Sequence, residues 1–201
     1  MKFDSSNYQP LDFIDKLDTK NHLISLYHNS DYGKMIQHHF IKKGLQKEEH
    51  CILFTHDNIE LIEKEMTDDG INVDYFKQKN LLHIYQIKDV MNHPNGIFKG
   101  FDEILKKIIS DSKPPYWIAG RVIPNVSTTN GIKAELELER VVHRNFDDLN
   151  CSFLCSYNLD KLEEKKRTVW LEHLLKNHHC VIYAVEPKNA VALDSDLLIN
   201  A

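Results

Sequence analysis

Short apolar runs alternate with helix-like segments along most of this chain, and this alternation constrains the fold more than any other feature. The runs have the length of one buried strand each and cover residues 23–27, 50–55, 81–87, 116–120, 151–157 and 181–185. The segments between them place apolar residues at helical spacing, most clearly from Phe101 to Ile109. Alternating strands and helices predict the α/β class, with a mostly parallel sheet flanked by helices on both faces and linked by right-handed crossovers.

The two ends of the chain lie outside this alternation. Residues 1–20 are expected to form an N-terminal extension, whose apolar patch from Leu11 to Leu17 packs on the domain edge or on a second subunit. The α/β domain is expected to cover residues 21–186. The remaining tail, 187–201, is predicted to be frayed or docked on the surface.

Two of the predicted helices contain many charged residues, so the side of each helix that faces the core has to be predicted. The helix that contains Val141 is predicted to turn this residue toward the core and Glu139 toward solvent, unless Glu139 holds a ligand or Arg121. A charged helix is predicted over residues 158–177, with Val169 among its apolar contacts.

The first strand and helix have the layout of a phosphate-binding loop. A polar turn after the strand leads to Gly33 and Lys34 and then to a helix that is predicted to stop at Gly44. In such a layout, backbone N–H groups and a helix N-terminus point at an anion. The full pattern G-x-x-x-x-G-K-[ST] needs a glycine and a hydroxyl where this chain has His28 and Met35. The sequence therefore favours a binding site with an altered ligand over intact nucleoside triphosphatase chemistry.

Composition argues against several other classes of protein. The net charge of -5 is unlike that of a nucleic-acid surface, and no apolar run approaches the ~20 residues of a membrane span. The N-terminus lacks the apolar core of a signal peptide, so we expect a cytoplasmic location and no nucleic-acid or membrane partner. The four cysteines form no C-x-x-C pair, and the adjacent histidine pairs at 38–39 and 178–179 diverge on a helix. We therefore expect buried reduced thiols and no metal site.

Ligands of parallel α/β sheets bind beyond the carboxyl ends of the strands, so these ends provide the candidate site. The residues there are Tyr27, His28, His56, Asp57, Gly120, Arg121, Tyr157 and Asn158. Lys34 and Arg121 would place two cations at one crevice, which suits an anionic or carbonyl-bearing ligand. In the alternative interpretation, Arg121 pairs with Glu137 or Glu139 of the long helix.

Several short motifs, taken in order, resemble a known family. They are His22–Tyr27, Phe40–Leu45 leading into Cys51–Phe54, Arg121-Val122, Glu139-Arg140, Leu154–Tyr157, and His178 or His179 before Val181. Together they cover about residues 20 to 185 and resemble the MEDS domain, the sensory domain of methanogens, methylotrophs and DcmR-type regulators.

This resemblance implies a RecA/KaiC-like P-loop NTPase core with a degenerate phosphate loop and no catalytic residues. Where active relatives carry an acidic pair, this chain has His56-Asp57, and where they carry a magnesium-binding aspartate it has Gly120-Arg121. The implied function is a sensory domain that binds a small organic molecule and signals to a partner protein or by self-association. The expected ligand-binding residues are Tyr27, His28, Asn29, Gly33, Lys34, His56, Asp57, Arg121, Glu139 and Tyr157. No cofactor is expected; the alternative is a divergent KaiC-like ATPase or phosphotransferase that uses ATP and magnesium.

Overall fold

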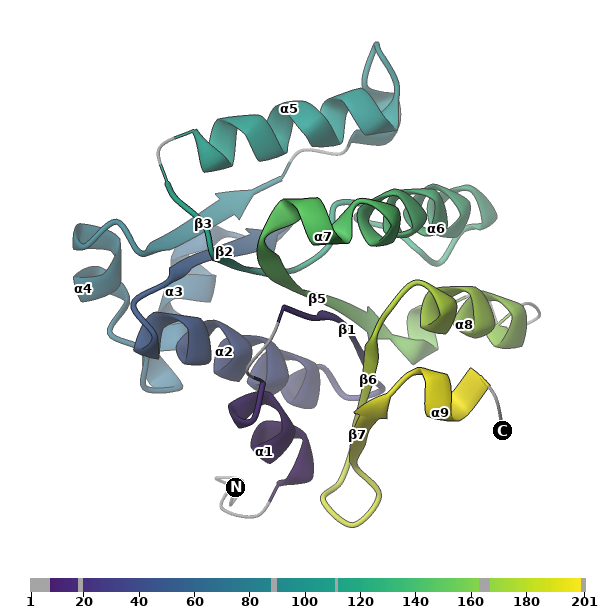
Figure 1. Ribbon diagram of the computed structural model, residues 1–201, viewed down its shortest axis with the longest axis horizontal. Coiled ribbons are helices and arrows are strands. Elements are labelled where there is room, and N and C mark those ends of the chain that lie inside the picture. The colour runs from purple at the N-terminus through teal and green to yellow at the C-terminus, as the bar shows by residue number, and fades with distance from the viewer. Residues whose placement is uncertain (1–7, 18–19, 88–89, 111, 163–166, 200–201) are drawn as a thin grey trace.

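A seven-stranded sheet organises the part of the chain that the structure, a computed structural model, describes: residues 8–17, 20–87, 90–110, 112–162 and 167–199 (Figure 1). The strands are β1 (His22–Tyr27), β2 (His50–Thr55), β3 (Leu82–Gln86), β4 (Tyr116–Ala119), β5 (Cys151–Asn158), β6 (Cys180–Ala184) and β7 (Val191–Asp194). Their order in the sheet is β3-β2-β4-β5-β1-β6-β7. Neighbouring strands are parallel except for β6 and β7, which run antiparallel. The predicted α/β class with a mostly parallel sheet is confirmed.

The helices cover both faces of the sheet (Figure 1). Those of the first half of the chain are α1 (Gln9–Asp15), α2 (Ser30–Gln46), α3 (Ile59–Asp68) and α4 (Val73–Gln78), and their apolar side chains share one core. The later helices are α5 (Ile97–Ile109), α6 (Thr129–Arg144), α7 (Phe146–Leu149), α8 (Arg167–Lys176) and α9 (Asp196–Ile199), and α5 to α8 pack on the other core. Short 3-10 turns occupy Val90–Asn92 and Leu159–Lys161. We call the two sides of the sheet the α2 face and the α6 face.

Successive residues of a strand point to opposite faces, and this alternation assigns the central side chains. In β1, Leu23 packs in the core of the α2 face and Ile24 in that of the α6 face. In β5, Leu154 belongs to the α2 face, whereas Cys155 and Tyr157 belong to the α6 face. Polar side chains that these strands direct to the α2 face are therefore separated by the sheet from those directed to the α6 face.

Helix α2 follows β1 after only two residues because its first turn has a local cap. The side chain of Asn29 accepts a hydrogen bond from the backbone N–H of Asp31 at 2.9 Å. The predicted stop at Gly44 is wrong, since the helix continues to Gln46. A Cβ at Gly44 would lie 2.4 Å from Cγ of Trp117, so this glycine lets the helix approach the sheet closely.

The first described helix, α1, packs on the α2 face, and the last, α9, lies against β7 and α8. The hydroxyl of Tyr8 donates to the carbonyl of Val185 at 2.8 Å, and Leu11 and Ile14 of α1 are buried against α2. The expected tail contains β7 and α9, so the strand at 181–185 is not the last one. Of the expected extension and tail, residues 1–7, 18–19 and 200–201 lie outside the described residues.

Two helix predictions need correction. The helix expected over residues 158–177 is α8, which begins at Arg167; β5 extends through Asn158, and residues 163–166 lie outside the described part. Val169 is exposed, whereas Leu174, also expected among the apolar contacts, is buried together with Trp170. In α6, Glu139 is buried rather than solvated, because it lies on the same side of the helix as Leu138 and Val142.

Candidate functional site

The carboxyl ends of β1, β2, β4 and β5 border a crevice of about 280 Å³ on the α2 face. Six of the ten residues predicted to bind a ligand line it: Tyr27, Gly33, Lys34, His56, Asp57 and Arg121. Lys34 and Arg121 therefore face the same cavity, although α2 and the β4 end that carry them are far apart in the sequence.

Two glycines shape this crevice through close packing. A Cβ at Gly33 would lie 2.6 Å from Cε1 of Tyr27, so this glycine accommodates the tyrosine ring against the first turn of α2. Gly120 has φ +117, and a Cβ there would lie 2.3 Å from the carbonyl oxygen of Phe54. The chain can therefore turn at the end of β4 and bring Arg121 into the crevice.

Burial controls the protonation of the titratable groups in the crevice. It raises the pKa of Tyr27, and the positive charges of Arg121 and Lys34 only partly oppose this. It also lowers the pKa of His56, whose Nδ1 lies 3.2 Å from the carbonyl oxygen of Ile87. Tyr27 consequently stays a neutral hydroxyl that can donate a hydrogen bond to a ligand.

Two buried donors in the crevice make no hydrogen bond to any described residue. They are Nη1 of Arg121 and Oγ of Ser156. A buried polar atom without a partner costs free energy, about 1–3 kcal/mol and more for a charged group. A ligand with acceptor oxygens at this position would remove that cost.

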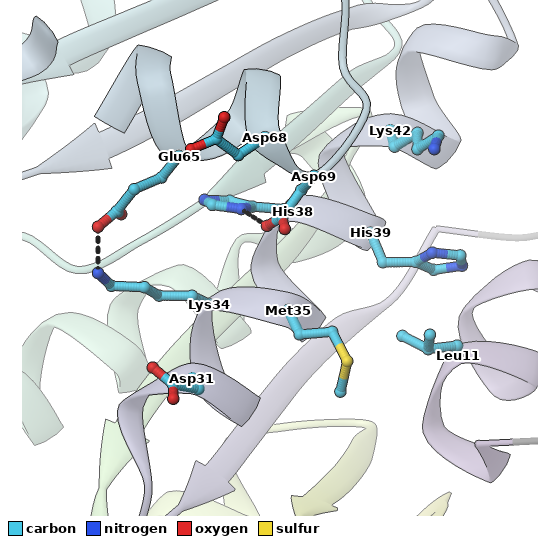
Figure 2. A pocket seen from close by; sticks show the side chains of 10 residues that line it. All are labelled: Leu11, Asp31, Lys34, Met35, His38, His39, Lys42, Glu65, Asp68 and Asp69. Atoms are coloured by element: carbon cyan, nitrogen blue, oxygen red, sulfur yellow. Dashed lines mark hydrogen bonds and ion pairs between the residues drawn. The ribbon is translucent and has the colours of Figure 1, made fainter. Parts of the chain in front are cut away.

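A larger cavity of about 520 Å³ lies beside the crevice, between α1, α2 and α3 (Figure 2). Its principal charges already pair with one another. Nζ of Lys34 lies 2.6 Å from Oε1 of Glu65, and Nδ1 of His38 lies 2.5 Å from Oδ2 of Asp69. Lys34 lines both cavities, but of the two only the crevice is also lined by Arg121, whose Nη1 makes no hydrogen bond to a described residue, so we take the crevice as the candidate ligand site.

His28 and Asn29 lie apart from the crevice lining, in the two-residue connection between β1 and α2. Nδ1 of His28 lies 2.8 Å from Oδ1 of the exposed Asp160, and Asn29 caps α2. A connection of two residues cannot wrap its backbone around a phosphate chain, and the Asn29 side chain already occupies one N–H of the helix start. The layout of a phosphate loop is present without its anion-binding backbone.

Glu139 and Tyr157, the other two predicted residues, lie on the α6 face. The hydroxyl oxygen of Tyr157 lies 2.5 Å from Oε1 of Glu139 and 2.9 Å from Oε1 of Glu135. The Tyr157 hydroxyl has only one proton to donate. It can therefore hydrogen-bond to both carboxyl groups only if one of them is protonated and donates to the hydroxyl oxygen. Burial, followed by the charge of Glu139, raises the pKa of Glu135, so Glu135 is the carboxyl of the pair that is more readily protonated.

Arg121 connects the two faces. Its guanidinium carbon lies 5.3 Å from the centre of the Tyr157 ring, within cation–π range. The alternative partner Glu137 is exposed and pairs with Arg140 of its own helix. Sequence reasoning missed Glu135 and Ser156; the signal for Glu135 was its four-residue spacing from Glu139, within a stripe that includes Leu138.

The described helices include none that is both long and apolar enough to cross a membrane. The four cysteines are buried and free of disulfide bonds.

The mostly parallel α/β sheet, flanked by helices and with this crevice at its strand ends, has a RecA-like fold. The family model of MEDS, the MEthanogen/methylotroph, DcmR Sensory domain, matches residues 21–179, and the chain belongs to this family. The family resemblance drawn from the sequence motifs is thereby confirmed, and membership indicates a sensory role. No curated protein matches the sequence.

Solved structures share the fold at low sequence identity. A Pyrococcus horikoshii OT3 protein, PH0250, superposes with a TM-score of 0.59 at 9% identity, over 92% of this chain and 91% of that chain. The KaiC-like protein PH0186 from the same hyperthermophilic archaeon gives a TM-score of 0.55 at 13% identity, over 81% of this chain and 70% of that chain. At these identities the likeness shows the fold alone, and it agrees with the expected RecA/KaiC-like core.

Proposed function

We propose that this chain is a non-catalytic sensory domain that binds a small anionic or carbonyl-bearing organic molecule between Lys34 and Arg121. The signal passes to a partner protein or to a second copy of the chain. The observation that carries the proposal is that Arg121, which lines the strand-end crevice, has a buried Nη1 with no hydrogen-bond partner among the described residues.

The chemistry of the crevice matches such a ligand. An acceptor oxygen can receive hydrogen bonds from Arg121, from the hydroxyl of Ser156 and from the neutral hydroxyl of Tyr27. The carboxylate of Asp57, in the same crevice, disfavours a highly charged anion. The volume of about 280 Å³ lies just below the usual range for drug-sized ligands, about 300–1,000 Å³, and suits a molecule of few heavy atoms.

The alternative is a divergent ATPase or phosphotransferase. Phosphoryl transfer depends on a loop that holds the phosphates and on a metal that neutralises their charge. Here a two-residue connection after β1 stands in place of the phosphate-holding loop, and Arg121 at the end of β4 stands in place of the metal-binding residue. Lys34 at the start of α2 and Asp57 are the remaining features that favour a nucleotide.

A thermal-shift panel separates these functions. The probes are acetate, pyruvate and acetone, each beside an alcohol that lacks the charged or carbonyl group, and ATP with magnesium. We expect at least one carboxylate or ketone to raise the melting temperature of the wild-type protein, while its matched alcohol and ATP do not. Arg121→Met should abolish this shift because it removes the donor but keeps most of the apolar stem.

Arg140→Met is the matched control, since Arg140 is exposed on α6 and pairs with Glu137. It should retain the full ligand shift. Stabilisation by ATP that requires magnesium, together with ATP turnover lost in Lys34→Ala, would reject the sensory proposal in favour of the enzyme. A ligand shift that survives in Arg121→Met would place the binding site elsewhere.

A further inference from the structure

Four residues with metal-ligating side chains converge beneath α6, on the face of the sheet opposite α2. His22 begins β1, Glu139 lies in α6, Cys155 lies in β5, and His178 precedes β6 by two residues. All four are buried, and one potential ligand atom from each lies within 4.8 Å of the other three. We propose that these four side chains form a binding site for one divalent, borderline-soft transition metal, with Zn²⁺ as the best match. We call them the four-ligand cluster.

The distances between the ligand atoms fit a tetrahedral ion. Oε2 of Glu139 lies 3.1 Å from Nε2 of His22 and 3.4 Å from Nε2 of His178. Sγ of Cys155 lies 3.7 Å from Nε2 of His22. Ligands at about 2.0–2.3 Å from a tetrahedral zinc are separated from one another by roughly 3.3–3.7 Å, which these three distances approach, and the other pairs of ligand atoms lie within 4.8 Å.

Neighbouring hydrogen bonds orient two of these ligands. Nδ1 of His178 lies 2.6 Å from the carbonyl oxygen of Leu174, to which it donates, and this leaves the lone pair on Nε2 directed at the cluster. Nε2 of His178 makes no hydrogen bond to a described residue. The hydroxyl of Tyr157 holds Oε1 of Glu139, which leaves Oε2 for the metal. Nδ1 of His22 has no such partner in the described part of the chain.

The charges of the cluster also suit a dication. Glu139 offers a carboxylate, and His22 and His178 offer imidazole nitrogens. Burial raises the pKa of the Cys155 thiol, so this group releases its proton as the ion binds. With Cys155 as a thiolate and Glu139 as a carboxylate the site carries two negative charges, which one divalent cation balances. Thiolate, imidazole and carboxylate together are a ligand set that zinc accepts.

This site is independent of the proposed ligand, because the four residues lie across the sheet from the main crevice. A narrow cavity of about 20 Å³ nevertheless reaches Glu139, Cys155 and Arg121, with room for about one water molecule. The expectation of no metal site considered cysteine pairs with C-x-x-C spacing and adjacent histidines, which are ligands close together in the sequence. The residues that converge here come from four separate elements.

The test uses Co²⁺ as a spectroscopic substitute for zinc in the full chain. Protein produced in cobalt-supplemented medium should carry one cobalt per chain, with the visible bands of a tetrahedral site and a near-ultraviolet thiolate-to-cobalt band. Cys155→Ser should lose the thiolate band. The matched control is Cys151→Ser, since Cys151 is equally buried on the same face of β5 but outside the cluster, and it should keep the band.

A second measurement needs no variant and therefore no assumption about folding. X-ray absorption of the zinc-loaded wild-type protein should show one sulfur at about 2.3 Å and nitrogen or oxygen ligands at about 2.0–2.2 Å. Tyr157→Phe, which removes the positioning hydroxyl, should weaken metal affinity by about 10- to 100-fold in chelator competition. Folded wild-type protein that takes up no cobalt, a shell without sulfur, or a thiolate band that persists in Cys155→Ser would overturn the proposal.

Discussion

The strand-end crevice and the four-ligand cluster both gather polar side chains from separate segments, and both leave buried polar atoms without a hydrogen bond to a described residue, but they differ in how enclosed they are. In the crevice, Arg121 and Ser156 keep buried donors without partners beside an opening. In the cluster, Glu139 lies within 3.4 Å of both His22 and His178 in the protein interior. The first arrangement suits a ligand that exchanges, and the second suits an ion that is retained and contributes to stability.

The two regions meet at one contact, the guanidinium of Arg121 over the ring of Tyr157. Tyr157 in turn binds Glu139. The predictions below test whether the regions differ in their contributions to stability and to binding.

The largest expected effect is the loss of stability in Glu139→Ala. Without this carboxylate, His22, His178 and Tyr157 lose a buried partner, and the free energy of unfolding should fall by about 3–5 kcal/mol. Urea denaturation in the presence of a chelator measures this change without any contribution from a bound metal.

Glu137→Ala is the control for this substitution, because Glu137 lies two residues away on the same helix and is exposed. It should change the free energy of unfolding by about 0.5 kcal/mol or less. Equal effects of the two substitutions would show that Glu139 is solvated, as the sequence alone suggested.

An intermediate effect is expected for Gly33→Ala in the crevice. Alanine favours a helix by about 1 kcal/mol relative to glycine, but its Cβ would meet the ring of Tyr27 at 2.6 Å. Overpacking of this kind costs about 1–3 kcal/mol, so we expect a net loss of about 1 kcal/mol, measured by urea denaturation, together with a weaker ligand shift. A stabilised variant with unchanged ligand binding would mean that the tyrosine ring moves aside freely.

The smallest effect concerns the pH dependence of stability. The pKa of His56 is lowered by burial from its ordinary value of 6.5, so the unfolded chain binds more protons than the native protein below about pH 6.5. The wild-type protein should therefore lose stability as the pH falls through this region, and His56→Gln should lose less. Between about pH 7.5 and about pH 5, the melting temperature of the wild-type protein should fall more than that of His56→Gln, so the two curves converge or cross. Parallel curves would contradict the lowered pKa of His56.

Several elements could be predicted from the sequence because their signals are local. The apolar runs located β1, β2, β4 and β5, and the rule for strand ends then identified Tyr27, His56, Asp57 and Arg121 as neighbours. Where local signals compete with packing, the prediction was wrong. Val169 falls on the exposed side of α8, and Gly44 serves helix–sheet contact instead of a helix end.

By itself, the sequence determined the α/β class, the family resemblance and the edge of the sheet at which the crevice lies. Hydrophobic periodicity and turn chemistry act over a few residues, so a single chain displays them directly. Only the tertiary structure decided that Glu139 points inward and that His22 meets Cys155, 133 positions away in the sequence. Such contacts depend on the strand order and register of the sheet, which place β1 between β5 and β6, and no local pattern encodes that arrangement.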